Sequence, residues 1–146
     1  MNIRTLFQPQ SLTARQSTGI LILRVVAGLA FMHHGWGKIQ HPFDWMGPGA
    51  TMPAFFQGLA ALSEFGGGLA WIVGLLTPLA ALGIASTMIV AIRLHAIVMH
   101  NSFVSSKPGE MSYELAAVYL CVALLLIFTG PGKFSLDQAF FRKSRF

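Results

Sequence analysis

Long apolar blocks alternate with short polar or Pro- and Gly-rich segments along this chain, and the alternation predicts four membrane-crossing helices. Each block is close to the ~20 residues that an α-helix needs to cross ~30 Å of hydrocarbon. A backbone inside lipid must satisfy its own hydrogen bonds, so we interpret the blocks as helices rather than strands. The predicted helices cover about residues 18–39, 55–76, 79–99 and 113–129. We therefore predict an all-α fold, a polytopic membrane four-helix bundle formed by one domain over residues 1–146.

The connections between the predicted helices differ in kind. Residues 40–54 are rich in Pro and Gly, which is typical of a loop, and the aromatic residues among them predict that the loop folds onto the bundle or the membrane interface. Thr77-Pro78 indicates a tight turn, so the second and third helices are expected to form a close antiparallel hairpin. Small residues at four-residue spacing favour this close approach. They are Gly66, Ala70, Gly74, Gly83, Thr87 and Ala91.

Positive charge is concentrated at the two ends of the chain. The terminal basic residues are Arg4, Arg15, Lys133, Arg142, Lys143 and Arg145. Loops on the cytoplasmic side of membrane helices carry an excess of Lys and Arg. Four crossings leave both termini on one side, so we expect both termini in the cytoplasm. Residues 134–146 mix Phe with basic side chains, which predicts an amphipathic C-terminal tail at the interface, with a disordered tail as the alternative.

Composition supports the membrane class and excludes some functions. The chain is 54% hydrophobic and 10% charged, against about 25% charged in soluble domains. The net charge of +5 lies at the chain ends, so we predict contact with the lipid bilayer and no nucleic-acid partner. Cys121 is the single cysteine, which excludes an intrachain disulfide and a CxxC redox pair. Because it lies in an apolar run, we expect it to be a small buried residue.

Ionisable residues inside the predicted helices are the main functional signal. A charge near the bilayer centre costs about 2.5–3.5 kcal/mol even on insertion-based scales, so such groups must be paired, hydrated or used. Counting ~1.5 Å per residue along each helix leaves Arg24 alone in the inner half, the half nearer the termini. The other groups gather in the outer half or just beyond it. They are His33, His34, Lys38, Glu64, Arg93, His95 and Glu114.

Depth and helical spacing predict partners for these groups. Arg93 and Glu114 are level on helices adjacent in sequence, so we expect an ion pair between them. Glu64 is within reach of Lys38, Arg93 or a stretched Arg24. His34 and Lys38 are four residues apart and share a helix face. His95 points almost opposite to Arg93, so the two side chains are not expected to face one narrow cavity together.

Two interpretations of the outer cluster remain open. The charges are either ion pairs that fix helix register or the lining of a polar cavity that binds a ligand. For the second interpretation, Glu64 and Glu114 are the candidates for a proton relay. The candidate ligand-binding residues are His34, Lys38, Glu64, Arg93 and His95.

An anionic or quinone-like ligand suits this residue set, because quinone chemistry needs proton donors beside an apolar slot. Haem held by histidines of the first and third helices is a second cofactor hypothesis. No cofactor motif supports it, so haem is not expected. The sequence contains no nucleotide fingerprint and no thiolate metal site, and no metal site is predicted.

Three short motifs, in this order, resemble the DoxX family of small four-helix membrane proteins over about residues 20–131. They are His34-Gly35-Trp36-Gly37-Lys38, Glu64-Phe65-Gly66-Gly67 and Gly74-Leu75-Leu76-Thr77. The resemblance implies a four-helix bundle in the inner membrane of a bacterium or archaeon. It also implies a link to quinones, because some relatives are subunits of a thiosulfate:quinone oxidoreductase. Related eukaryotic proteins act as assembly factors, so the resemblance leaves open whether the chain is part of an enzyme.

Residues and resemblance together give one functional hypothesis and its alternatives. The chain is expected to be a membrane subunit of quinone-linked redox chemistry in the bacterial inner membrane, working with redox partner subunits. The alternative is a non-enzymatic scaffold or assembly factor, and a small-solute or proton transporter is a third hypothesis. The face formed by Gly66, Ala70 and Gly74 also makes a homo-oligomer possible.

Overall fold

The computed structural model describes residues 12–141, and every regular element in that range is helical, which confirms the all-α prediction. The α3, η1 and α4 elements follow one another without a break, as do α5 and η2, where η denotes a single π-helical turn. The elements in chain order are α2 (Ala14–Gln40), α3 (Ala54–Ala61), η1 (Leu62–Gly66), α4 (Gly67–Val73), α5 (Thr77–Arg93), η2 (Leu94–Val98), α6 (Glu114–Thr129) and α7 (Leu136–Phe141).

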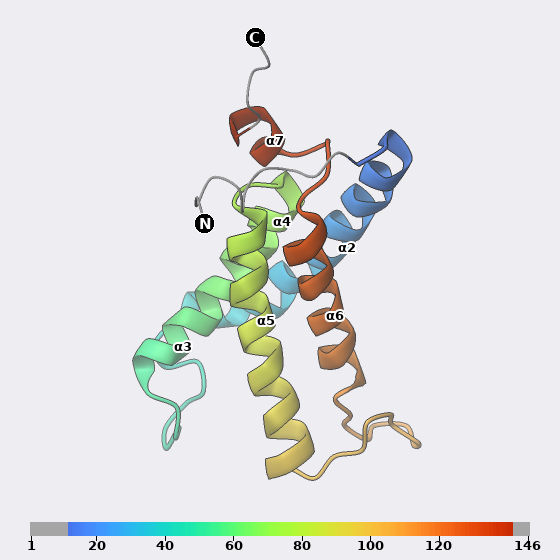
Figure 1. Cartoon of the computed structure of the whole chain (residues 1–146). Coiled ribbons are helices and arrows are strands. Elements are labelled where there is room, and N and C mark those ends of the chain that lie inside the picture. Colours follow the sequence, from blue (N-terminus) through green and yellow to red (C-terminus); the bar gives the residue numbers. More distant parts are fainter. Residues whose placement is uncertain (1–11, 142–146) are drawn as a thin grey trace.

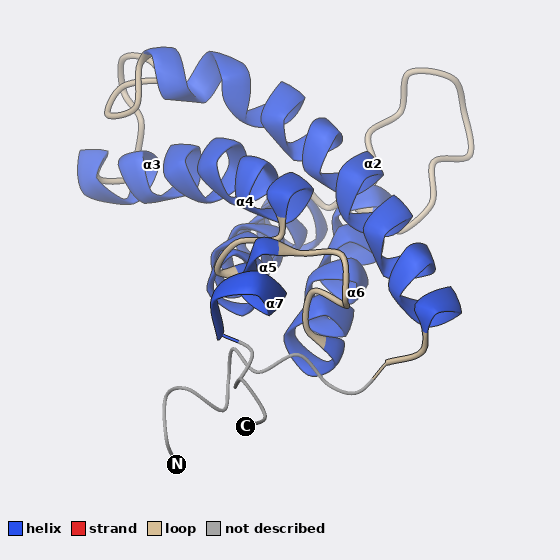
Figure 2. Ribbon diagram, turned by 90° about the horizontal axis from the view of Figure 1, so that it is seen from above, coloured by secondary structure: helices blue, strands red, loops and turns tan. Residues whose placement is uncertain are grey.

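The helices are arranged as two pairs (Figure 1). Helix α2 packs against η1 and α4, and α5 packs along α6, while contacts between α4 and α5 join the pairs. Helices α2 and α6 make few direct contacts. Figure 2 shows α5 and α6 nearly end-on but α2 and α3–α4 from the side, so the first pair is strongly tilted against the second. The start of α2 and the whole of α7 lie at the same end of the molecule (Figure 1).

Local sequence explains where the long helices begin and end. Helix α2 starts four residues earlier than predicted, because Thr13 and Gln16 form a capping box. In it, the Thr13 hydroxyl accepts from the Gln16 amide at 3.3 Å, and the Gln16 side-chain oxygen accepts from the Thr13 amide at 2.9 Å. Helix α4 ends at Val73 because Gly74 adopts a left-handed conformation with φ of 71°.

Helix length and outward side chains agree with a membrane environment. Ala14–Gln40 and Thr77–Val98 are long and apolar enough to cross a membrane, and Glu114–Thr129 is a shorter apolar helix. Large apolar side chains on these helices point outwards, a pattern that soluble monomers avoid over extended surfaces. Cys121 on α6 is also exposed, so the expectation that it would be buried is wrong.

Glycines bring α2 close to the helix that carries η1 and α4. A Cβ atom on Gly28 would lie 2.6 Å from the carbonyl oxygen of Gly68, and one on Gly35 would lie 2.6 Å from the backbone nitrogen of Phe65. Neither position has room for a side chain. The small-residue pattern predicted a close approach of the second and third helices. Gly83 does face Ser63 across that interface, but a Cβ on Gly66 would meet only Leu62 of its own helix.

Candidate functional site

A buried ion pair joins α2 to η1. The Lys38 ammonium donates to Oε1 of Glu64 at 2.6 Å, and the Glu64 side chain is only 7% exposed. The π-helical turn η1 changes the direction of the side chains that follow it, and such turns occur frequently at functional sites. The second carboxylate oxygen, Oε2, is shielded from solvent and has no hydrogen-bond partner among residues 12–141. The pair therefore leaves one strong acceptor unsatisfied inside the protein.

The loop of residues 41–53 covers the lysine of this pair. The Lys38 ammonium lies 4.6 Å from the centre of the Trp45 ring, a distance suited to a cation–π interaction. The Trp45 indole nitrogen donates to the backbone carbonyl of Gln57 at 3.0 Å. The buried Gln57 amide in turn accepts from the Met46 backbone and donates to the Met52 carbonyl. This network confirms that the loop folds onto the helices.

A pocket of about 280 Å³ adjoins the ion pair. It lies toward the end of the molecule opposite α7, between α2, η1, the last part of α5, η2 and the start of α6 (Figure 1). One side carries ionisable groups, and the other is mainly apolar. Its lining residues are Phe31, His34, Lys38, Glu64, Met88, Ala91, His95, Ser112, Leu115, Ala116 and Tyr119.

His95 reaches this pocket from η2 and is held by Asn101. The Asn101 side-chain nitrogen lies 2.9 Å from Nδ1 of His95, and the Asn101 backbone amide donates to the His95 carbonyl at 2.8 Å. An amide nitrogen can only donate, so in this arrangement Nδ1 accepts and the ring proton resides on Nε2. With this tautomer, His95 is positioned to donate from Nε2 at the pocket wall.

The structure brings together four of the five predicted ligand-binding residues. His34, Lys38, Glu64 and His95 line the pocket, whereas Arg93 is exposed and does not. The expectation that His95 and Arg93 would not face one cavity together agrees with this placement.

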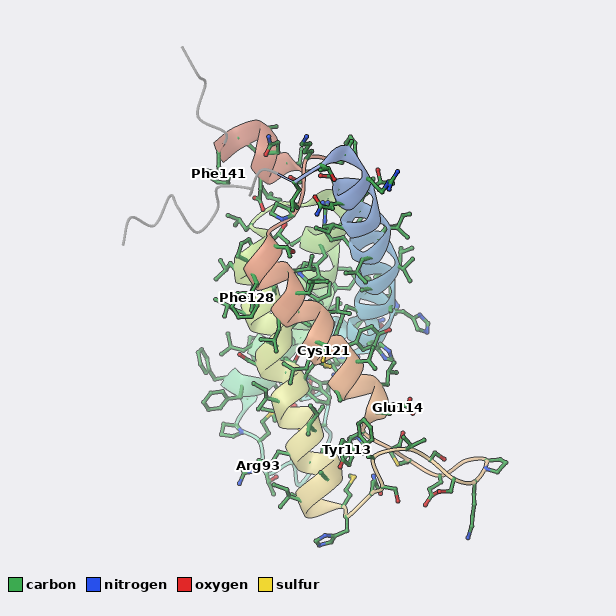
Figure 3. The ribbon with its side chains drawn as sticks, turned by 45° about the vertical axis from the view of Figure 1, so that its right-hand side comes forward. Arg93, Tyr113, Glu114, Cys121, Phe128 and Phe141 are labelled. Atoms are coloured by element: carbon green, nitrogen blue, oxygen red, sulfur yellow. The ribbon has the colours of Figure 1, made fainter. Side chains whose placement is uncertain are left out.

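The predicted ion pair between Arg93 and Glu114 is wrong. Both side chains are exposed, and Figure 3 shows them on opposite sides of the α5–α6 pair. Within the described part of the chain, Lys38–Glu64 is the salt bridge that forms. Glu114, a candidate for the proton relay, lies outside the pocket lining. Equal depth was a poor guide here because it ignores the direction in which each side chain leaves its helix.

Arg24 is fully buried at the other end of the molecule, and its partners are backbone carbonyls. Its guanidinium donates to the carbonyls of Trp71 at 2.7 Å and Ile72 at 3.1 Å, which lie in the last turn of α4. It also donates to those of Pro131 at 2.6 Å and Phe134 at 3.0 Å. A positive charge at a helix C-terminus is favourable. Arg24 therefore fixes the end of α4 and the segment before α7 rather than pairing with Glu64.

Asp137 of α7 completes the same junction. Its buried carboxylate accepts from the backbone amides of Leu76 at 2.6 Å and Thr77 at 2.9 Å, at the start of α5. The sequence alone did not single out Asp137. The predicted tail helix of residues 134–146 is present as Leu136–Phe141, and residues 142–146 lie outside the described range.

Sequence reasoning also missed Tyr119 and Asn101. Tyr119 lines the pocket, and its ring lies 4.8 Å from that of Phe31. A signal for Tyr119 existed, because it places a phenol within the uncharged apolar run of the fourth predicted helix. Asn101 carried no signal, because it follows the predicted helix as an ordinary loop residue.

Comparison with known proteins identifies a family and several relatives that this chain resembles. The DoxX family model matches residues 19–101, the stretch from early α2 to just beyond η2. Inner membrane protein YqjF of Escherichia coli (strain K12) is 33% identical over 134 residues, which cover 88% of this chain and 96% of that protein. An uncharacterized membrane protein of Mycobacterium tuberculosis is 31% identical, with 89% of this chain and 86% of that protein covered. An uncharacterized protein of Haemophilus influenzae is 30% identical, with 85% and 92% covered. No solved structure matches the chain.

Proposed function

The chain belongs to the DoxX family of membrane proteins, and from this premise we propose that it is a membrane subunit of quinone-linked redox chemistry whose pocket binds a quinone-type ligand. One observation carries the proposal. The Lys38–Glu64 ion pair borders a pocket that also has an apolar wall, and it leaves Oε2 of Glu64 without a partner. A pair that served only to join two helices would be expected to satisfy both carboxylate oxygens.

The chemistry of the pocket suits a ring with polar oxygens. Lys38 and His95 can donate to a carbonyl oxygen, and Glu64 can exchange a proton with a bound hydroxyl. Phe31, Met88 and Leu115 supply apolar surface against which a ring can pack. Typical ligand pockets hold ~300–1,000 Å³, so this smaller one suits a single aromatic ring.

We propose that a lipid-soluble ligand enters from the side, between α2 and α6, where the Phe31 and Tyr119 rings meet. Both helices contribute to the pocket wall, yet they make few contacts with each other. The apolar tail of a quinone would leave the pocket between them and remain in the lipid.

We further propose that four helical segments cross the inner membrane with both termini in the cytoplasm. These segments are α2, α3–η1–α4, α5–η2 and α6. The start of α2 and α7 lie at one end of the molecule (Figure 1). The basic residues Arg15, at the start of α2, and Lys133, shortly before α7, belong to this end of the molecule. The pocket would then open near the opposite, outer side.

Quinone binding by pocket variants tests the proposal. Purified protein in lipid nanodiscs is titrated with a decyl-tailed benzoquinone, and Lys38→Met and Ala116→Phe are compared with the unaltered chain. The first removes a donor and the second fills the pocket, so each is expected to weaken binding about tenfold or more. Arg93→Met is the matched control, because it removes a cation outside the pocket and should leave the affinity unchanged. The proposal is contradicted if the unaltered chain does not bind the quinone, or if Lys38→Met and Ala116→Phe bind it as tightly as the unaltered chain.

A scaffold or assembly factor is the second candidate, and one observation favours it. The Lys38–Glu64 pair directly connects α2 with η1, so its loss would loosen this contact even without a ligand. The two functions differ in the effect of added quinone. A scaffold should show no increase in unfolding temperature when quinone is added, whereas a binding site should show a concentration-dependent increase.

A further inference from the structure

The unsatisfied oxygen of Glu64 specifies what a ligand must supply. Oε1 already accepts from Lys38 at 2.6 Å, while Oε2 is buried without a partner. A carboxylate oxygen can only accept, so the missing partner must be a donor. A carbonyl group cannot fill this role, but a hydroxyl group can.

The opposite requirement holds at His95. The Nδ1 atom is occupied by the Asn101 amide at 2.9 Å, and the same residue is tied to the His95 carbonyl through its backbone amide at 2.8 Å. With Nδ1 accepting, the Nε2 proton is the group that His95 can offer to the pocket. Its ligand partner must therefore be an acceptor oxygen.

We infer that the pocket selects a single aromatic ring carrying a hydroxyl group that donates to Glu64 and a second oxygen that accepts from His95. This inference rests on the proposed function and refines it. Of the two forms of a quinone, the dihydroxy form has the required donor, whereas the dicarbonyl form leaves Oε2 of Glu64 unsatisfied. The ring itself would lie beside Phe31 and Tyr119, whose ring centres are 4.8 Å apart. Asn101 is a positioning residue, because it acts only through the His95 ring.

Binding of a matched pair of ligands tests the inference. Protein in nanodiscs is titrated anaerobically with tetramethylhydroquinone and with tetramethylbenzoquinone, which share one carbon skeleton and differ in the hydroxyl protons. We expect the dihydroxy ligand to bind about tenfold more tightly, because hydrogen bonds to a charged group are the stronger class. Glu64→Gln replaces an obligate acceptor by an amide that can donate or accept, so it should remove this preference.

The tautomer of His95 is tested separately by the ¹⁵N resonances of its ring nitrogens. The unaltered chain should show the proton on Nε2, and a spectrum of His95→Phe identifies which signals belong to this residue. Asn101→Asp replaces the donor by an acceptor and should move a proton to Nδ1, whereas Asn101 with a merely structural role would leave the ring signals unchanged.

The outcomes separate the inference from the proposed function. Binding of neither ligand overturns both. Binding of both ligands with equal affinity, or tighter binding of the dicarbonyl form, overturns the selectivity inference and leaves the proposed function standing. If Glu64→Gln does not fold, the comparison of the two ligands on the unaltered chain still decides the question.

Discussion

At the scale of single residues, burial divides the charged groups into two kinds. Arg24 donates to four backbone carbonyls, so its hydrogen-bonding capacity is used within the protein. Glu64 is almost as deeply buried, yet half of its carboxylate has no partner. Buried polar groups in native proteins are nearly always satisfied. Arg24 is therefore structural, whereas Glu64 keeps one buried acceptor that no described residue satisfies.

We therefore expect replacements of Arg24 and Arg93 to have unequal effects on the free energy of unfolding. Arg24→Met should lower the free energy of unfolding by about 3 kcal/mol or more, because it removes hydrogen bonds to several buried carbonyls. Arg93→Met should change that free energy by less than about 0.5 kcal/mol, because Arg93 is exposed. Reversible unfolding in mixed detergent micelles measures both. Equal stability of the two variants would show that the Arg24 contacts contribute little.

At the scale of elements, the contact between α2 and the η1–α4 helix determines the geometry of the site. Gly35 on α2 lies against the backbone of Phe65, the residue that follows Glu64. Lys38 extends from the same helix, less than one turn further on. The close approach of the two backbones is thus what places Lys38 within hydrogen-bonding distance of Glu64.

Two glycines on α2 provide a matched test of this contact. Gly35→Ala would place a Cβ 2.6 Å from a backbone nitrogen, so it should destabilise the protein by about 1–3 kcal/mol and separate Lys38 from Glu64. Gly37→Ala adds a methyl group where no atom lies within 4 Å, and it should stabilise the helix by up to about 1 kcal/mol. Thermal unfolding in nanodiscs compares the two. A neutral Gly35→Ala would contradict the close contact.

The π-helical turns explain which parts of the site the sequence could predict. Apolar blocks and helical spacing predicted the helices, and they also indicated that His34, Lys38 and Glu64 belong to one region. A π-turn shifts the helical register by one residue, and no sequence pattern signals it. The turn η2 contains His95, a pocket residue, whereas Arg93, just before it, remains exposed. The sequence therefore suggested the cluster but could not decide which of these two residues faces it.

At the scale of the whole molecule, long-range contacts account for the features that the sequence could not predict. Arg24 is bonded to carbonyls at positions 131 and 134, more than a hundred residues away. Asp137 caps the start of α5 from the far end of the chain. No local pattern marks a backbone carbonyl as the partner of a buried arginine. The result is a molecule with a polar junction around Arg24 and Asp137 at one end and the pocket beside Glu64 toward the other.

The most direct test of the central claim is to locate a bound quinone by photo-crosslinking. A benzoquinone carrying an azido group is irradiated with the protein in nanodiscs, and the labelled peptides are identified by mass spectrometry. We expect labelling within residues 31–38 of α2 and 115–119 of α6, and loss of that labelling in Ala116→Phe. Labelling confined to other helices, or undiminished labelling in Ala116→Phe, would contradict the assignment of this pocket as the quinone site.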